Sequence, residues 1–513
     1  MAFHGTDSLA IDSKGDLVLV AGAAEVRLAK PIIYQKHGRA RKVIDGGYVL
    51  HDASQVGFQL GVYDSTAPLV VDPVLIYSTY LGGAAEDRGV AVAVDSTGNT
   101  YLAGTTASPD FLNRNGGASQ DAFVVKLNST GSNLIYAAYL GGSNDDRVSG
   151  VAVDSSGSVY LAGTTSSANL PVINALQPKP AGQSDVFLAK WNAAGSQLIY
   201  STYLGGSNEE GGLDLAVDGL GSAYVTGYTY SKNFPVLNAV QPEFAGGLID
   251  AFVAKLTSSG SLAYSSYLGG SDADHGRSIA VDLQGAAYVA GATASANFPG
   301  APVGRQVLTG DSDGFVVKLS PLGSPLLYSN LLGGGSGEEA FSVAVDAVGN
   351  AYIAGVTTSN DFPVLEAFQP TFAGRADIFV TKLSATGATT LFSSYLGGSR
   401  NESRPCVAID GSGRLHVMGT TGSTNFPTVN PVQAAMAGGT DMFIARMQAS
   451  GTAMEYSTYL GGRDIDELWG CSADSNGNAY AIGYTRSTDF RMVNAFQPAL
   501  KGKGDAVFVK IAP

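Results

Sequence analysis

The sequence predicts an all-β protein: a seven-bladed β-propeller of four-stranded antiparallel blades, preceded by a small N-terminal β-domain. Three observations predict this fold, namely a repeat of nearly constant length, four strand-like runs in each repeat, and an unusual composition. The chain has 513 residues, of which 67 are glycine and only 14% are charged. That charged fraction is about half of the usual one, as expected for short strands joined by tight turns.

The repeat is defined by a Leu-Gly-Gly sequence that follows an aromatic-rich run. The first glycine of this sequence recurs after 59 residues once and then after 64 residues five times. The seven positions are Gly82, Gly141, Gly205, Gly269, Gly333, Gly397 and Gly461. A fixed period of this length marks a solenoid, a propeller or an array, so residues 73–513 are expected to form one body.

Residues 1–72 lie outside the repeat and are predicted to form a small β-rich domain, the remnant of a larger one. LAIDSKGDLVLVAG predicts two strands, and EVRLAKPIIYQ, GGYVLHD and VGFQLGVYD predict one strand each. Apolar and polar residues alternate in these runs, which is typical of strands with one buried face. We place the boundary to the repeats at Pro73.

Each repeat contains four strand-like runs, here called A to D. In the third repeat they are GLDLAVD, SAYVTGY, DAFVAKL and LAYSSYL. A and B are joined by an Asp-Gly-Leu-Gly turn, C and D by a Ser/Gly turn, and B and C by a longer loop with two prolines. Four antiparallel strands in each of seven units are the pattern of a β-propeller.

Strand A is predicted to be innermost, because sheets converge at the axis and need small side chains there. The position two residues before the aspartate of the A–B turn is small in every repeat: Ala93, Ala152, Ala216, Ala280, Ala344, Ala408 and Ser472. The repeats begin with an unpaired D run at residues 75–81 and end on a C run at 506–511. We expect this D run to complete blade seven, so that the ring closes without an open edge.

Four motifs recur in fixed order, YSTYLGG, [VI]A[VI]D-x-x-G, NFPV-x-NA-x-QP and D-x-FV-x-KL. In this order they resemble the SBBP family of bacterial seven-bladed β-propeller repeats over about residues 73–513. Residues 1–72 resemble the tail of the β-rich domain that precedes such propellers in large exported bacterial proteins. The resemblance implies export and a binding or scaffold role, and it brings no catalytic residues to assign.

Charge and hydropathy exclude several classes of partner. The net charge is −14, from 44 acidic and 30 basic residues, which argues against nucleic acid and against anionic membranes as partners. No apolar run is long enough to span a membrane. The first thirty residues show no signal peptide, so we expect a cytoplasmic protein or a mature or trimmed chain. The composition and the resemblance favour a secreted or cell-surface monomer without a cofactor.

Two acidic positions recur in all seven repeats. The first follows the Leu-Gly-Gly sequence: Asp87, Asp146, Glu210, Asp274, Glu338, Glu402 and Asp466. The second opens the A–B turn: Asp95, Asp154, Asp218, Asp282, Asp346, Asp410 and Asp474. Clustered carboxylates suit hard cations, so a metal-binding rim is one interpretation. Because functional sites usually break internal symmetry, we favour a structural role in which the carboxylates bind backbone groups.

The residues that break the symmetry gather at the predicted mouth of the axial channel. They are Arg88, Arg147, Asp214, His275, Arg277, Arg404 and Trp469. Such a set around a concavity suits a sugar, a carboxylate or a peptide, with Trp469 as a stacking platform. Alternatively, the arginines neutralise the acidic ring and Trp469 fills a gap. We therefore predict a non-catalytic binding or scaffold module for a glycan, peptide or protein ligand.

His275 supports a second hypothesis, a carbohydrate-active enzyme of the polysaccharide lyase or glycoside hydrolase type. With Asp272 or Asp274 it would provide the acid and the base that glycosidic chemistry uses. The chain has no GxSxG or HExxH motif and no GxGxxG in a βαβ setting. We favour the binding module because no complete catalytic set is visible.

Cys406 and Cys471 are the only cysteines, and they are predicted to lie in the A strands of repeats six and seven. A disulfide would tie these two blades together if the two Cα atoms lie within about 7 Å of each other. The sequence does not decide which face of blade six meets blade seven. We favour two buried free thiols that act as small apolar residues, with the disulfide as the alternative.

Overall fold

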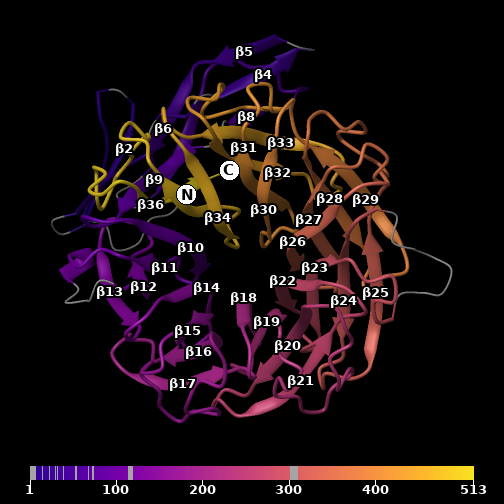
Figure 1. Cartoon of the computed structure of the whole chain (residues 1–513). Helices are drawn as coiled ribbons and strands as arrows, with labels where there is room; N and C mark the ends of the chain where they lie inside the picture. The colour runs from indigo at the N-terminus through magenta and orange to yellow at the C-terminus, as the bar shows by residue number, and fades with distance from the viewer. Residues whose placement is uncertain are drawn as a thin grey trace.

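Seven four-stranded antiparallel sheets form a ring in this computed structural model, with three small N-terminal sheets beside it (Figure 1). The structure describes residues 7–512 except 14, 22–23, 29, 32, 38–39, 52–54, 68, 72–73, 114–118 and 301–309. Within this part of the chain the only helical segment is a short 3-10 turn at Phe111–Asn113. The predicted all-β, seven-bladed propeller is confirmed.

The strands of each of the first six blades follow the chain order from the axis outward. Blade one is β10 (Asp87–Val94), β11 (Thr100–Thr106), β12 (Asp121–Leu127), β13 (Leu134–Leu140); blade two is β14 (Asp146–Val153), β15 (Val159–Thr165), β16 (Asp185–Trp191), β17 (Leu198–Leu204). Blade three is β18 (Glu210–Val217), β19 (Ala223–Thr229), β20 (Asp250–Leu256), β21 (Leu262–Leu268); blade four is β22 (Asp274–Val281), β23 (Ala287–Thr293), β24 (Asp313–Leu319), β25 (Leu326–Leu332). Blade five is β26 (Glu338–Val345), β27 (Ala351–Thr357), β28 (Asp377–Leu383), β29 (Thr390–Leu396); blade six is β30 (Glu402–Ile409), β31 (Leu415–Thr421), β32 (Asp441–Met447), β33 (Met454–Leu460).

Blade seven joins the two ends of the propeller. It consists of β34 (Asp466–Ala473), β35 (Ala479–Thr485), β36 (Asp505–Ala512) and, as its outermost strand, β9 (Val74–Leu81). β9 is antiparallel to β36, with Leu81 opposite Ala506 and Tyr77 opposite Lys510. The predicted closure by an N-terminal outer strand is therefore confirmed.

The N-terminal region forms three sheets at the edge of the ring (Figure 1). Their strands are β1 (Ser8–Ile11), β2 (Leu17–Ala21) and β3 (Ala24–Leu28); β5 (Ala40–Ile44), β4 (Ile33–His37) and β8 (Leu69–Val71); and β6 (Gly46–Leu50) with β7 (Val56–Leu60). The single strand expected at residues 25–35 is two strands, because Pro31 lacks the N–H that continuous pairing needs. Sequence analysis missed β5 and β8, and Pro73 lies outside the described residues.

Apolar side chains of successive blades interleave to form the core. Between blades two and three, for example, Tyr160, Leu188, Leu215, Val225 and Phe252 pack in one cluster and are at most 6% exposed. Burial of each such side chain stabilises the fold by roughly 1.5–3 kcal/mol. Each interface between neighbouring blades therefore has its own apolar cluster, and these clusters follow one another around the ring.

Each innermost strand carries a β-bulge near its start, where the register with the next strand shifts. The seven bulge positions are Val90, Ser149, Leu213, Arg277, Phe341, Pro405 and Trp469. The bulge of blade six is longer and includes Arg404, whose φ is +51°. A bulge redirects side chains locally, and all seven of these side chains line the axial cavity.

The residue after the bulge links neighbouring blades at the hub. The Asp214 carboxylate accepts a hydrogen bond from the Ile279 N–H (2.9 Å), and the Ser278 hydroxyl oxygen accepts one from the Val343 N–H (3.2 Å). The Ser342 hydroxyl oxygen likewise accepts one from the next blade. We call these contacts, together with the disulfide described next, the hub links.

Cys406 occupies the same position in blade six and forms a disulfide with Cys471 of blade seven, with 6.0 Å between the two Cα atoms. The preference for free thiols was therefore wrong. The hub links of the preceding blades explain the pairing. They reach Ile279, Val343 and Val407, which occupy the same repeat position as Cys471. Gly150 and Gly470 occupy this position in blades two and seven, where a Cβ would collide with the backbone of the next blade.

Candidate functional site

The first acidic ring is buried and hydrogen-bonded to the protein itself. In blade two, Asp146 accepts hydrogen bonds from the N–H of Gly142 (2.7 Å) and from the hydroxyl of Ser167 (2.8 Å). The backbone contact recurs in every blade. These carboxylates therefore hold the crossover between blades. Among the described residues, no group of three or more His, Cys, Asp or Glu is placed to hold a metal.

The first acidic ring also explains why the residue after leucine in the Leu-Gly-Gly sequence is glycine. Glu210 and Asp185 of the preceding blade place their buried carboxyl groups on either side of Gly205, and burial raises the pKa of Glu210 to about 7. A Cβ on Gly205 would collide with both carboxyl groups. Glu402 and Asp377 form an equivalent pair, with the pKa of Glu402 also raised by burial to about 7. Glycine is required where the chain passes these buried carboxyl pairs.

The second acidic ring forms a repeated cluster at the opposite end of the hub strands. Asp154 accepts hydrogen bonds from the N–H groups of its own turn, and it lies 2.9 Å from the hydroxyl of Tyr160 and 3.4 Å from the ammonium of Lys190. That ammonium lies over the Tyr160 ring, 4.6 Å from its centroid. Equivalent ion pairs occur throughout blades one to five. We call this cluster the Asp–Tyr–Lys rim.

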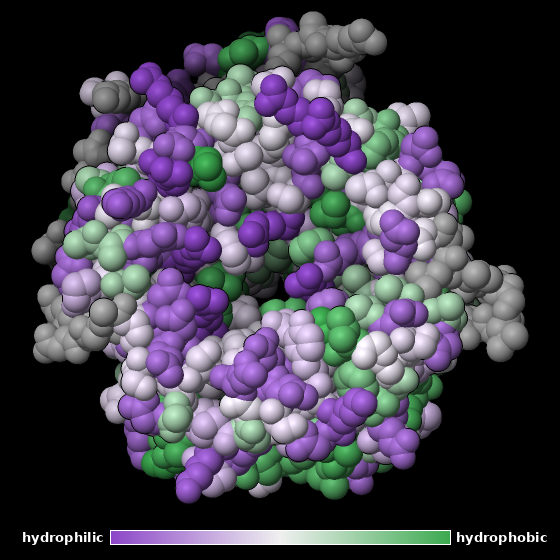
Figure 2. Space-filling view, viewed as in Figure 1, coloured by the Kyte–Doolittle hydropathy of each residue, from purple (hydrophilic) through white to green (hydrophobic). Residues whose placement is uncertain are grey.

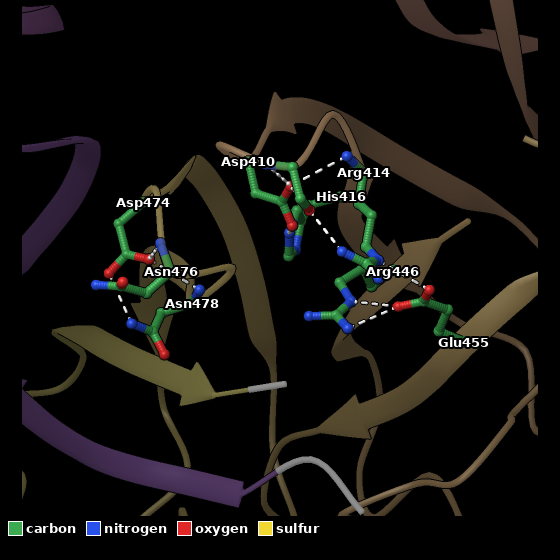
Figure 3. Close-up of polar contacts among 9 residues, drawn as sticks. Asp410, Arg414, His416, Arg446, Glu455, Asp474, Asn476 and Asn478 are labelled. Atoms are coloured by element: carbon green, nitrogen blue, oxygen red, sulfur yellow. Dashed lines mark hydrogen bonds and ion pairs between the residues drawn. The ribbon is translucent and has the colours of Figure 1, made fainter. Parts of the chain in front are cut away.

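Blade six departs from this pattern, because His416 replaces the tyrosine and Arg446 replaces the lysine (Figure 3). The fully buried His416 ring lies 3.3 Å from Asp410, and burial lowers the pKa of His416. Arg446 and Arg414 both bind Glu455. Sequence analysis overlooked this cluster, although the replacement of the repeated tyrosine was a visible signal. Its burial is typical of a structural contact.

The axial cavity has a volume of about 290 Å³ and is lined by the innermost strands of all seven blades. Figure 1 shows these strands around a central opening, and Figure 2 shows a hollow at the centre of the ring. Of the seven predicted site residues, Asp214, Arg277, Arg404 and Trp469 line the cavity. Arg88, Arg147 and His275 do not belong to its lining.

Arg404 and Trp469 form the centre of the mouth. The Arg404 guanidinium lies over the indole ring, 3.7 Å from its centroid, and the Arg88 guanidinium lies 5.8 Å from the same centroid. Arg88 also approaches the Tyr484 ring at 5.4 Å and forms an ion pair with Glu86 (2.5 Å). The indole therefore stacks with arginine, whereas sequence analysis assigned it as a platform for the ligand.

Arg404 is half-buried and has no hydrogen bond or ion pair with any other described residue. Burial lowers its pKa, Glu467 acts in the opposite direction, and the charges of Arg88 and Arg277 lower it further. The indole N–H of Trp469 is also buried without a hydrogen-bond partner in the described part of the chain. The mouth therefore contains two kinds of donor without an acceptor, in a place where an unmatched donor is costly.

Arg277 and Asp214 already have partners within the protein. Arg277 is bound to Glu339 of blade five, and its guanidinium lies 5.6 Å from the centroid of the Phe341 ring. Asp214 accepts hydrogen bonds from the Ser278 hydroxyl (2.8 Å) and the Ile279 N–H, and burial raises its pKa to about 6. Arg404 thus differs from its neighbours in lacking a partner.

The acid–base pair of the enzyme hypothesis is not assembled. The His275 ring packs against Tyr228 at 5.6 Å between centroids, and burial and the charge of Arg277 lower the pKa of His275. In the described part of the chain, His275 has no hydrogen bond to Asp272 or Asp274. The Asp274 carboxylate instead accepts hydrogen bonds from a backbone N–H and a serine hydroxyl.

Arg147 lies outside the cavity. Its side chain is 63% exposed, forms an ion pair with Asp145 (2.9 Å) and donates a hydrogen bond to Gln120 (3.1 Å). The structure therefore separates Arg147 from the Arg404–Trp469 centre, although the sequence places it at the same repeat position as Arg88. The position of a residue in the repeat predicts its blade and its place along the strand, but it does not predict the direction of a long exposed side chain.

One family model, described as "Beta-propeller repeat" (SBBP), matches residues 76–111, 135–171, 199–235, 263–299 and 327–363. A second, "Domain of unknown function (DUF7948)", matches residues 1–74. The chain is 29% identical over 352 residues to "Regulatory protein FlaEY" of Caulobacter vibrioides, covering 64% of this chain and 35% of that protein. It thus spans about a third of this relative.

Two solved structures are similar at low identity. A protein of unknown function from Dyadobacter fermentans has a TM-score of 0.41 at 9% identity, over 85% of this chain and 98% of that one. Quinohemoprotein alcohol dehydrogenase from Comamonas testosteroni has a TM-score of 0.39 at 8% identity, over 86% and 76%. No helix among the described residues could cross a membrane. The seven blades and the matching family models show that the chain belongs to the SBBP β-propeller repeat family, with a DUF7948 domain at its N-terminus.

Proposed function

We propose that this protein is a non-catalytic binding module of an exported protein, which holds a ligand at the mouth of its axial channel. One observation carries the proposal. The seven bulge positions that line the cavity hold seven different residue types, whereas the Asp–Tyr–Lys rim at the other end of the hub repeats with the same ion pair in blades one to five. A repeated contact serves the fold, and a set of different residues around one concavity suits one ligand.

Two further observations support the proposal. The Cys406–Cys471 disulfide is of the kind that persists in oxidising compartments, which supports export. The guanidinium of the half-buried Arg404 has no hydrogen-bond acceptor in the described part of the chain, and a ligand in the cavity would supply one. Glycans and peptides both carry suitable acceptor groups.

Tryptophan fluorescence provides a direct test, because the chain contains only Trp191 and Trp469. Trp191 is buried in the core of blade two, at 5% exposure, so a W191F variant makes Trp469 the single reporter of the mouth. Ligands selected on glycan and peptide arrays would then be titrated into this variant. We expect the emission of Trp469 to change on binding.

The matched control is W469F in the wild-type background, which keeps an aromatic ring but removes the indole N–H. We expect this variant to bind the selected ligands about tenfold more weakly, which corresponds to roughly 1.4 kcal/mol. Ligands that bind without a change in Trp469 emission, and with equal affinity for W469F, would show that the mouth is not the binding site.

A further inference from the structure

We infer that the ligand presents both a carboxylate and hydroxyl groups to the mouth, as a uronic acid residue does. This inference rests on the proposed function and names the chemical class of its ligand. It is carried by the juxtaposition of the unpaired Arg404 guanidinium with the Asp214 carboxylate in the lining of one small cavity.

The carboxylate is assigned from the state of the three mouth arginines. Arg88 is bound to Glu86 and Arg277 to Glu339, which leaves Arg404 as the one without a described partner. Guanidinium has five N–H donors and no acceptor, in a planar geometry that matches the two oxygens of a carboxylate. The stacking contact of 3.7 Å with Trp469 fixes one face of this plane, so that the donors along its edge remain for the ligand.

No carboxylate in the described part of the chain forms an ion pair with Arg404. The charge of Glu467 raises the pKa of Arg404, but the two side chains form no hydrogen bond or ion pair in the described part of the chain. The indole N–H of Trp469 adds a second donor without an acceptor. A positively charged group of donors binds an anion more strongly than it binds a neutral acceptor, and it disfavours a cation.

The hydroxyl groups are assigned from the rest of the lining. Asp214 lines the cavity, and within the described part of the chain it accepts hydrogen bonds from Leu215, Ser278 and Ile279 alone, which leaves acceptor positions on its two oxygens. An anion without hydroxyl groups would meet the negative charge of Asp214 unfavourably. A hydroxyl group would donate to Asp214 while the carboxylate of the same ligand binds Arg404.

The size of the cavity limits the ligand further. A volume of about 290 Å³ lies at the lower end of the range for small-molecule sites. It accommodates one sugar-sized group rather than a long stretch of chain. An acidic peptide would offer Asp214 its backbone N–H groups, whereas a uronic acid carries hydroxyl donors on the same ring as its carboxylate. A terminal uronic acid is therefore the better fit to a cavity of this size.

The test uses the W191F protein and three matched probes: a galacturonate-terminated oligosaccharide, its methyl ester, and the same oligosaccharide ending in galactose. The ester keeps the shape of the acid and removes its charge. We expect the acid to change Trp469 emission with an affinity at least about tenfold higher than that of the ester or the neutral sugar. In R404Q the acid and the ester should bind with equal affinity. R404K should retain part of the preference for the acid, because lysine keeps the positive charge but lacks the two parallel N–H donors of guanidinium.

The outcomes separate this inference from the proposed function. If the acid and the ester bind equally well, or if R404Q keeps the preference, the anion assignment is wrong although the mouth still binds a ligand. If peptides ending in aspartate change Trp469 emission and the uronate does not, the hydroxylated-acid class is wrong. If no probe acts at Trp469 while array ligands bind elsewhere on the protein, both the inference and the proposed function fail.

Discussion

The side-chain contacts at the two ends of the innermost strands differ in how closely they repeat from blade to blade. At the rim end, Asp154, Tyr160 and Lys190 of blade two have equivalents with the same contacts in four other blades. At the mouth end, the equivalent bulge positions carry a different residue type in each blade, for example Val90 in blade one and Trp469 in blade seven. What these positions share is the bulge itself. The difference indicates that the rim contacts stabilise the blades that carry them, whereas the mouth residues have no such repeated role.

The hub itself shows a second contrast. From blade three to blade seven, each blade is joined to the next by a side-chain hydrogen bond or by the disulfide. At Gly150 and Gly470 the backbones of adjacent blades approach closely instead. Neighbouring blades are thus held together near the axis in two ways, by side-chain links or by close backbone packing.

The largest effect is expected from removing the closing strand. Deletion of residues 1–82 removes β9 and the buried side chains of Tyr77, Tyr80 and Leu81 from blade seven. We expect a loss of about 5 kcal/mol or more, and exposure of the β36 edge should cause aggregation. Denaturant unfolding and light scattering test this. A truncated protein that unfolds like the parent and stays monomeric would contradict the closure.

The hub links are expected to differ in strength. Removing the disulfide by C406S/C471S should lower the free energy of unfolding by about 2–4 kcal/mol. S342A, which removes a hydrogen bond at the same position of the preceding blade, should cost about 1 kcal/mol. Chemical denaturation of both variants measures the difference. Two titratable thiols in the denatured, unreduced wild type would show that the disulfide does not form.

The carboxyl pairs predict a pH dependence of stability. Burial raises the pKa values of Glu210 and Glu402 to about 7, so the folded state holds more protons than the unfolded state between about pH 4 and pH 7. This contribution is complete below the unfolded pKa values and is lost as pH rises towards 7. His275 and His416, whose pKa values are lowered by burial, act in the opposite direction below about pH 6.5.

The E210Q variant isolates this effect. A glutamine side chain keeps the size of Glu210 beside Asp185, and its amide does not titrate. We expect the loss of stability between pH 5 and pH 8 to be smaller in E210Q than in the wild type, with both histidines unchanged as an internal control. Thermal unfolding across this range is the measurement. Identical slopes for the two proteins would mean that Glu210 titrates normally.

The smallest effect is expected for His275. It packs on Tyr228 without a carboxylate partner in the described part of the chain, so H275A should leave the affinity for the mouth ligand within about twofold. The same variant tests the enzyme hypothesis in a polysaccharide-degradation assay. Turnover by the wild type that disappears in H275A would overturn the preference for a binding module.

The fold could be predicted almost completely, because a repeat of 64 residues shows each strand seven times. The small residues of strand A located the axis, and the unpaired D run predicted the closure at β9. The site could be predicted only in part. Sequence spacing indicates where Arg88, Arg404 and Trp469 lie along their strands. The bulges that direct side chains into the cavity, in contrast, cannot be recognised from a sequence motif.

The disulfide and the blade-six cluster show the same limit. The pairing of Cys406 with Cys471 depends on which faces of adjacent blades meet, and this follows from the twist of the sheets rather than from spacing. His416 was visible as a departure from a repeated tyrosine, but its burial against Asp410 was not. Contacts within a blade are therefore easier to predict from this sequence than contacts between blades.

A paired comparison of R404Q and K190A tests the central claim most directly, because one variant changes the mouth and the other the rim. Both would be made in W191F, and each would be measured by Trp469 titration and by denaturant unfolding. We predict that R404Q weakens ligand binding at least about tenfold with little change in stability. K190A should lower the free energy of unfolding by about 1 kcal/mol and leave binding intact. Unchanged binding in R404Q, or an equal loss of binding in K190A, would contradict the division of the hub into a binding end and a structural end.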